Sequence, residues 1–209
     1  SMHSWYARSH QPAHYADYTL FVAEVASTVN ENLLIENLLG KTSDLRERLV
    51  LLNQYLENFK GTVYRQTMFA EFEKIVHEKA EEGQALDPET FNRTYLDLIR
   101  DYFGEGLVID DAVKYEWARI PHFYRPFYVY VYATGYSSAV ALSEGIRRDG
   151  VPAVRRYLDF LSMGSSRHPL DELRHAGVDL DTPAPLDQAL EKFETVLDQA
   201  EEIARELGL

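Results

Sequence analysis

An apolar helical stretch near the start of the chain carries acids whose type and position suit cation binding. Val22, Val25 and Val29 recur at helical spacing, which predicts one face packed in a core. Glu24 falls beside that face, and Glu31 lies about two turns further along the same side. A carboxylate that leaves water must be paired, protonated or bound to a cation. The residues alone leave two interpretations open, a structural ion pair and a metal-ligating acid.

An aromatic stretch in the second half of the chain, residues 121–136, combines a histidine with several phenols. Tyr128, Tyr132 and Tyr136 are four residues apart, which places them on one face of a predicted helix. Buried hydroxyl groups need hydrogen-bond partners. A wall of phenols opposite a carboxylate would form a polar cleft, in which His122 and a tyrosine donate hydrogen bonds to a developing oxyanion. An aromatic core helix is the alternative interpretation.

The short motifs of common catalytic and nucleotide-binding sites are absent from the sequence: GxGxxG, the P-loop, GxSxG and an intact HExxH. The nearest string to HExxH begins at His77 and lacks the second histidine. His10 and His14 have the i, i+4 spacing of two zinc ligands, but Pro12 between them disfavours one regular helix. The sequence therefore contains no complete motif for a zinc site.

Composition narrows the classes of protein and partner. The chain has 209 residues, a formal net charge of −13 and no cysteine. This acidic balance lacks the basic footprint that nucleic-acid binding requires. Without cysteine there are no disulfides or thiolate metal ligands, which suits a reducing compartment. No apolar run is long enough to span a bilayer and no signal segment opens the chain, so we expect a cytoplasmic protein with no membrane partner.

Apolar spacing, capping residues and helix breakers together predict an all-α fold in a single helical domain, residues 1–209. Asp87 followed by Pro88 is typical of a helix start, and Gly83 of a helix end. Residues 107–109 have strand-like composition, but no neighbouring segment could pair with them. The predicted helices span residues 1–9, 15–39, 45–56, 62–82, 88–103, 127–148, 151–163, 169–175 and 186–207, with a linker at 183–185.

Several separated stretches, in this order, resemble the C-terminal part of the oligoendopeptidase F group in the thimet oligopeptidase-like (M3) family of zinc metallopeptidases. The resemblance extends over nearly the whole chain. It implies the C-terminal, multi-helix portion of a zincin-type catalytic domain. The matching stretches are Ser1-Met2-His3-Ser4, which resembles the residues after HExxH, then Asp17-Tyr18, residues 21–27, Asn30-Glu31, Pro121-His122-Phe123-Tyr124, Phe127-Tyr128, Tyr132-Ala133-Thr134-Gly135, Gly164-Ser165-Ser166, His168-Pro169-Leu170 and Ala176-Gly177-Val178-Asp179.

The resemblance also implies a reaction and roles for individual residues. The reaction is zinc-assisted hydrolysis of short peptides, with an oligopeptide as substrate. The metal-side residues that it implies are the zinc ligand Glu24 and the supporting residues Asp17, Ser27 and Glu31. The substrate-side residues that it implies are the catalytic His122, Tyr128 and Tyr132 and the peptide-binding Tyr124 and Tyr136, and which tyrosine assists catalysis is left open.

In this alignment the sequence begins directly after the second zinc histidine, so both histidine ligands and the general-base glutamate precede it. The resemblance then implies zinc in a longer parent protein. We expect this chain alone to lack zinc and to be inactive, because catalytic zinc needs three protein ligands. Surface that packs against the rest of the parent would be exposed, so we also expect self-association through the face near Trp5, Tyr6 and the tyrosine-rich stretch.

Two other classes of function remain open from the sequence. One is a non-catalytic helical module from a truncated or split gene, which binds peptides or a partner protein. The other is a helical scaffold unrelated to peptidases, in which Glu24 forms an ion pair with an arginine such as Arg8 or Arg125.

Overall fold

The computed structural model describes residues 2–209, and within them the chain is all-α, as predicted, with nine α-helices and no strand. Ser1, where the first predicted helix starts, lies outside the described residues. The helices belong to two compact units, one formed by the chain up to Lys60 together with Thr134–Leu209, and one by Gly61–Ala133. A single domain over residues 1–209 stays a prediction.

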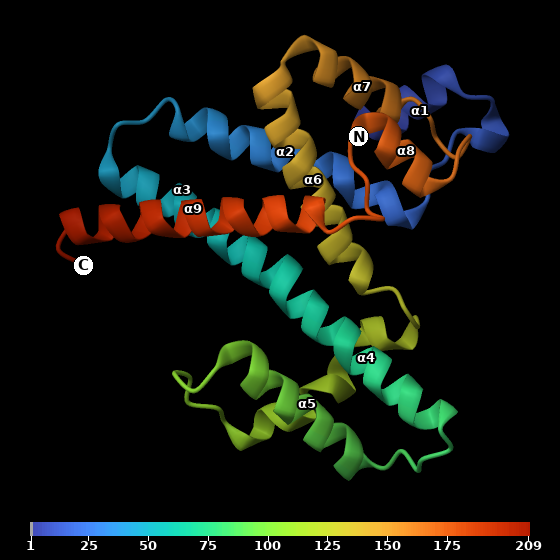
Figure 1. Ribbon diagram of the computed structural model, residues 1–209, viewed down its shortest axis with the longest axis vertical. Helices are drawn as coiled ribbons and strands as arrows, with labels where there is room; N and C mark the ends of the chain where they lie inside the picture. Colours follow the sequence, from blue (N-terminus) through green and yellow to red (C-terminus); the bar gives the residue numbers. More distant parts are fainter. Residues whose placement is uncertain (1) are drawn as a thin grey trace. The chain divides into compact units, whose positions relative to one another are not determined.

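The larger unit is built around the apolar face predicted from valine spacing. Its helices are α1 (Met2–His10), α2 (Leu20–Leu39), α3 (Leu45–Phe59), most of α6 (Tyr130–Asp149), α7 (Val151–Leu161), α8 (Pro169–Ala176) and α9 (Ala184–Glu206). Val22, Val25 and Val29 are buried in a core cluster with Phe160 of α7 and Leu173 of α8. Helix α9 packs against α3, and α7 packs against α8 (Figure 1). The core of this unit therefore lies where the helical periodicity places it.

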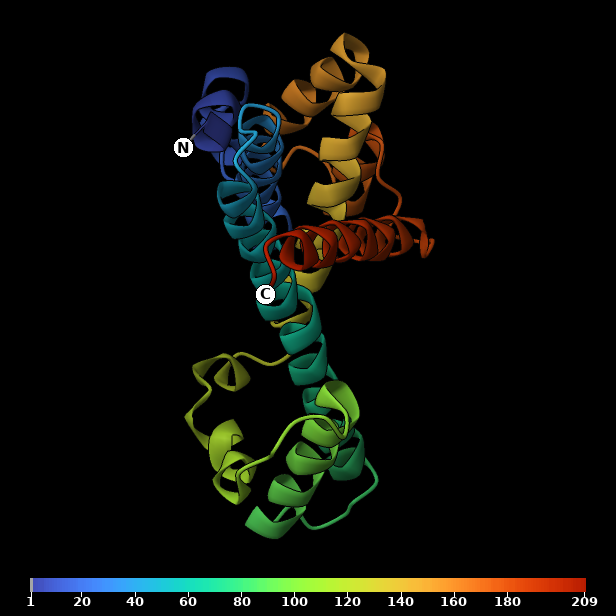
Figure 2. The same cartoon turned by 90° about the vertical axis from the view of Figure 1, so that its left-hand side faces the viewer.

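The smaller unit has its own aromatic core. It contains α4 (Arg65–Glu81), α5 (Pro88–Phe103), the 3₁₀ segments Asp111–Arg119 and Pro121–Tyr124, and residues 130–133 of α6. Helix α5 lies alongside α4 (Figure 2). Glu116 accepts hydrogen bonds from Arg65 of α4 at 2.6 Å and from the Tyr95 hydroxyl of α5 at 2.8 Å. These bonds hold the 3₁₀ segments on the helix pair, next to the residues predicted to act in catalysis.

Several predicted boundaries are wrong, and each difference has a local cause. The helix predicted at 15–39 begins at Leu20, because Ala13–Tyr15 forms a separate 3₁₀ turn and Thr19 is extended. The helix predicted at 127–148 begins at Tyr130, because the backbone of Phe127 is left-handed, with φ of 58°. Residues 107–109 form no strand, in keeping with their lack of a partner.

Two further predicted breaks are absent. The gap between the helices predicted at 45–56 and 62–82 is filled by the end of α3 and by a π-helical turn, Lys60–Tyr64, which connects α3 to α4. The predicted linker at 183–185 is in part the first turn of α9, where a proline costs no hydrogen bond. Within residues 2–209, no helix has the length and apolar composition that crossing a bilayer requires.

Candidate active-site residues

Glu24 lies on the exposed side of α2, one residue away from the buried Val25. The Ser27 hydroxyl, one turn later, donates to Glu24 Oε2 at 3.1 Å and lies 3.0 Å from the Glu24 carbonyl. The predicted partner Arg8 instead lies 3.8 Å from Asp17, so it does not neutralise Glu24. Glu24 is thus a solvent-accessible carboxylate, oriented by the serine predicted to support it and available to a cation.

The other two residues predicted beside Glu24 have different surroundings. Asp17 is exposed and follows the short 3₁₀ turn before α2. Within the described residues, its ion pair is with Arg8. Glu31 is exposed on α2, and its carboxylate is close enough to Tyr136 to raise the pKa of that phenol further, after burial has raised it. That Asp17 and Glu31 support the metal ligand Glu24 stays a prediction.

His122, Tyr128 and Tyr132 form one cluster in the smaller unit. The Tyr132 hydroxyl and His122 Nε2 are 3.3 Å apart, within hydrogen-bond distance. The His122 ring is parallel to the Tyr128 ring at 6.2 Å, and Tyr128 meets Tyr132 edge to face at 5.4 Å. A histidine and two phenol rings therefore share one half-buried site, and their hydrogen bonding to an oxyanion stays a prediction.

The cluster forms for a different reason from the one predicted. Tyr128 precedes α6, so it does not lie on a helix face with Tyr132 as the four-residue spacing suggested. Two turn-type hydrogen bonds lead the chain into α6 instead, from Val131 N–H to the Tyr128 carbonyl and from Tyr132 N–H to the Val129 carbonyl. They bring the two tyrosine rings together before the regular helix begins.

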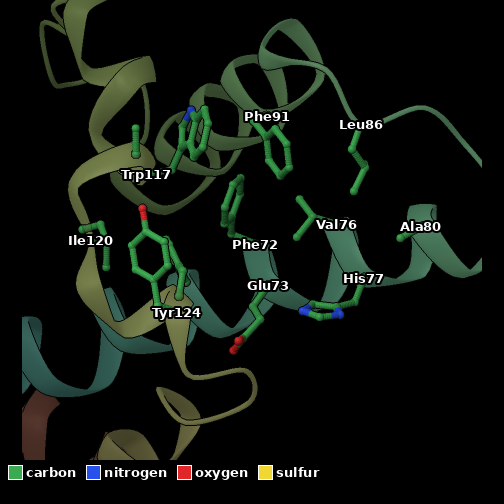
Figure 3. Close-up of a pocket in the computed structure, with 12 residues that line it drawn as sticks. Phe72, Glu73, Val76, His77, Ala80, Leu86, Phe91, Trp117, Ile120 and Tyr124 are labelled. Carbon is green, nitrogen blue, oxygen red and sulfur yellow. The ribbon is translucent and has the colours of Figure 1, made fainter.

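The two tyrosines predicted to bind peptide have contrasting environments. Tyr124 is 80% exposed and borders a cavity of about 300 Å³ in the smaller unit (Figure 3). Tyr136 is only 5% exposed, and its ring lies edge-on to Phe59 at 5.5 Å. Burial raises the pKa of the Tyr136 hydroxyl. Tyr124 is exposed and Tyr136 is buried, and peptide binding by either tyrosine stays a prediction.

Most residues that line the cavity are not among the predicted site residues. Apolar side chains, among them Phe72, Val76 and Phe91, form most of its wall, and Glu73 and His77 of α4 add polar groups (Figure 3). His77 begins the string that resembles HExxH but lacks its second histidine. The available signal was the i, i+4 spacing of Glu73 and His77 on an otherwise apolar helix side.

The chain supplies an incomplete set of ligands for zinc. Among residues 2–209, no group of three or more histidine, aspartate or glutamate side chains is arranged to hold a metal ion. Catalytic zinc sites use three protein ligands and keep a fourth position open. Glu24 fits one of these positions, because its carboxylate is accessible and Ser27 orients it. The part of the chain that the structure describes does not complete the set of three ligands.

Comparison with known proteins identifies the family. The model of peptidase family M3 matches residues 1–192. The chain is 56% identical over 203 residues to oligopeptidase PepF of Bacillus subtilis, covering 97% of this chain and 30% of that protein. It is 44% identical over 203 residues to the chromosomal oligoendopeptidase F of Lactococcus lactis subsp. cremoris, covering 97% of this chain and 34% of that protein.

Solved structures show the same similarity in three dimensions. Oligoendopeptidase-F of Enterococcus faecium superposes with a TM-score of 0.88 at 40% identity, over 98% of this chain and 38% of that one. A putative peptidase of Chlamydophila abortus superposes with a TM-score of 0.87 at 40% identity, over 98% of this chain and 34% of that one. The chain spans about a third of the length of the relatives that it matches. It belongs to peptidase family M3, and its fold is that of part of oligoendopeptidase F.

Proposed function

We propose that this chain provides one ligand and the oxyanion-binding groups of a zinc-dependent peptidase that hydrolyses short peptides. The observation that carries the proposal is the cluster of His122, Tyr128 and Tyr132 in a chain of peptidase family M3. The family relatives are named oligopeptidase and oligoendopeptidase, which supports an oligopeptide substrate. A chain with no cysteine suits a reducing compartment, so we place the reaction in the cytoplasm.

Each residue has a defined part in this proposal. A zinc ion held with the help of Glu24 would supply Lewis-acid chemistry toward a water molecule and a peptide carbonyl group. Glu24 offers a carboxylate ligand, and the Ser27 hydroxyl holds one of its oxygens in place. His122 and one or both of Tyr128 and Tyr132 donate hydrogen bonds to the oxygen on which negative charge develops, and such donors act most strongly when they are fixed in advance. Tyr124, which is exposed, contacts the peptide.

The other zinc ligands come, in this proposal, from residues outside these 209, in a longer chain that also carries HExxH. One accessible glutamate cannot hold catalytic zinc alone, since such sites need three protein ligands. The present chain should therefore bind zinc weakly and cleave no peptide. The proposal fits a chain that spans 30% of a related oligopeptidase.

Calorimetric zinc titration and cleavage of a fluorogenic oligopeptide test the proposal. The 209-residue chain is compared with a chain extended at its N-terminus to include HExxH, and Glu24→Gln is made in the extended chain. We expect tight zinc binding and peptide cleavage only in the extended chain, with its zinc affinity lowered at least about tenfold by Glu24→Gln. Glu57→Gln changes an exposed acid of α3 in the same unit and serves as the control.

Two results would contradict the proposal. Zinc-dependent cleavage by the 209-residue chain alone would show that its ligand set is complete. Unchanged zinc affinity in extended Glu24→Gln would remove Glu24 from the site. Peptide binding by the extended chain with neither zinc binding nor cleavage would favour the non-catalytic module.

A further inference from the structure

Phe127 has an unusual backbone directly beside the candidate catalytic cluster. Its φ is 58°, and it is the only residue other than glycine with positive φ among residues 2–209. An L-amino acid with a bulky side chain rarely adopts this conformation, so its surroundings must hold it there. The next residue is Tyr128. The backbone direction at Phe127 therefore decides where the Tyr128 ring points.

A buried carboxylate of α4 holds this backbone. Glu73 is 4% exposed, and its Oε1 accepts a hydrogen bond from the Phe127 N–H at 2.7 Å. His77, one turn later on α4, places its ring 4.6 Å from the Phe127 ring. Figure 3 shows Glu73 and His77 projecting from neighbouring turns of α4. This hydrogen bond fixes the direction of the Phe127 N–H, which is what holding a strained backbone requires.

Burial of Glu73 is costly unless the carboxylate has a specific use. The neighbouring residue Phe72 and the cavity wall around it are apolar. An apolar side chain at position 73 would fill the same space without the desolvation penalty of a charge. What the carboxylate adds is the hydrogen bond to Phe127, which joins residues 54 positions apart in the sequence.

The segment from His122 to Tyr128 is thus anchored at two residues, one near each end. Phe123 packs against Phe69 at 5.5 Å and against Phe72 at 5.2 Å, which anchors the residue after His122 in the core. Phe127, on Glu73, anchors the residue before Tyr128. Loss of the second anchor would leave His122 in place and release Tyr128.

We propose that Glu73 is a positioning residue, which holds Phe127 in its left-handed conformation and thereby sets Tyr128 against His122 and Tyr132. The consequence for peptide hydrolysis rests on the proposed function, whereas the effect on the cluster does not. In this proposal Glu73 acts through its hydrogen bond to the Phe127 backbone.

Nuclear magnetic resonance of the 209-residue chain tests the positioning role without zinc or substrate. Ring-to-ring contacts are recorded among His122, Tyr128 and Tyr132, and contacts between Phe69 and Phe123 report the fold of the same unit. We expect Glu73→Leu to abolish the contacts of Tyr128 with His122 while the Phe69–Phe123 contacts persist. Glu73→Gln, which keeps an acceptor oxygen, should retain them, and Glu78→Gln on the same helix is the control.

A second pair of variants addresses the backbone directly, and it does not depend on a buried position, since Phe127 is 55% exposed. Phe127→Gly and Phe127→Val both delete the ring, but only glycine adopts positive φ without strain. We expect the cluster contacts to survive in Phe127→Gly and to be lost in Phe127→Val. If Glu73→Leu fails to fold, this pair still tests whether the left-handed backbone at residue 127 sets Tyr128 against His122 and Tyr132.

Equal cluster contacts in Phe127→Gly and Phe127→Val, or full contacts in a folded Glu73→Leu chain, would overturn the proposal. In an extended chain that cleaves peptide, Glu73→Leu should lower kcat about tenfold with a smaller change in KM. If the extended chain is inactive but the cluster contacts respond as expected, the proposed function fails and the positioning role stands.

Discussion

One carboxyl group and one imidazole of the larger unit are buried, and burial disfavours the charged form of each. Glu172 of α8 is 2% exposed, and burial raises the pKa of its carboxyl group to about 7. His3 of α1 is 3% exposed and stacks on Tyr18 at 3.6 Å, and burial lowers the pKa of its imidazole to about 4. Both groups are therefore neutral in the folded chain over a range of pH in which they are charged in the unfolded chain.

Replacement of Glu172 by glutamine should change how stability depends on pH. Between about pH 4.5 and 7 the unfolded chain has released this proton and the folded chain has kept it, so the unfolding free energy falls as pH rises. The loss amounts to about 3 kcal/mol at most by pH 8. We expect Glu172→Gln to be more stable than the parent chain at pH 8 and to lose this advantage by pH 4.5.

Urea unfolding at several pH values measures this difference. The contribution of His3 has the opposite sign, because the folded chain binds fewer protons than the unfolded chain between about pH 4 and 6.5. That contribution is common to both chains and cancels in the comparison. A constant difference between Glu172→Gln and its parent across this pH range would contradict the prediction.

The residue scale also separates two kinds of aromatic in the tyrosine-rich stretch. Tyr132 is within hydrogen-bond distance of His122, whereas Tyr136, one helical turn later, is packed against Phe59. Equal spacing in sequence therefore does not give equal surroundings. The spacing indicated a polar wall, and the observed surroundings assign Tyr136 to a core.

At the scale of elements, the turn after α7 has a structural reason for its Gly-Ser-Ser sequence. Gly164 has φ of 58°, and a Cβ atom there would lie 1.9 Å from the Tyr15 carbonyl oxygen. The next residue, Ser165, donates its N–H to that same carbonyl at 2.9 Å. The Gln11 side chain also donates to the Ser162 carbonyl at 2.9 Å. These contacts join the turn to the segment between α1 and α2.

Gly164→Ala should destabilise the chain by at least about 2 kcal/mol, because a methyl group meets backbone at a left-handed position. Gly83→Ala is the matched control, since Gly83 has φ of 76° but no atom within 4 Å of an added Cβ. Chemical unfolding of both variants separates backbone strain, which they share, from the close approach, which only Gly164 has. Equal losses of stability would show that the close approach costs nothing.

At the scale of the whole molecule, large apolar side chains are exposed on a strongly acidic chain. Trp5 of α1 is 63% exposed and Leu20 at the start of α2 is 60% exposed. A net charge of −13 opposes association by repulsion, and salt screens that repulsion. The exposed apolar side chains favour the expected self-association through the face near Trp5, and the net charge opposes it.

We expect the 209-residue chain to associate as its concentration and the salt concentration rise. Trp5→Ser should weaken association, because it removes an exposed indole from the face predicted to pair. Light scattering coupled to size-exclusion chromatography measures the mass, and Val108→Ser, at an exposed apolar position in the other unit, is the control. A monodisperse monomer at every salt concentration would contradict the prediction.

Local patterns in the sequence were enough for the class of fold, most helices and the family. Helix α5 begins at Pro88 as predicted, because the Asp87 side chain accepts a hydrogen bond from the Thr90 N–H at 2.8 Å. These two residues are only three positions apart in the sequence. The buried face of α2 follows in the same way from residues three and four apart. Such contacts lie within one element, so its sequence contains the information.

The tertiary structure decided the features that depend on distant partners. The left-handed Phe127 is held by Glu73, and Gly164 meets the carbonyl of Tyr15. Local sequence assigns Phe127 to an ordinary helix start and Gly164 to an ordinary turn, because neither partner lies nearby in the chain. By itself the sequence determined which residues are available for chemistry. The turns outside the regular helices decided that His122, Tyr128 and Tyr132 meet, and packing against a distant helix decided that Tyr136 is buried.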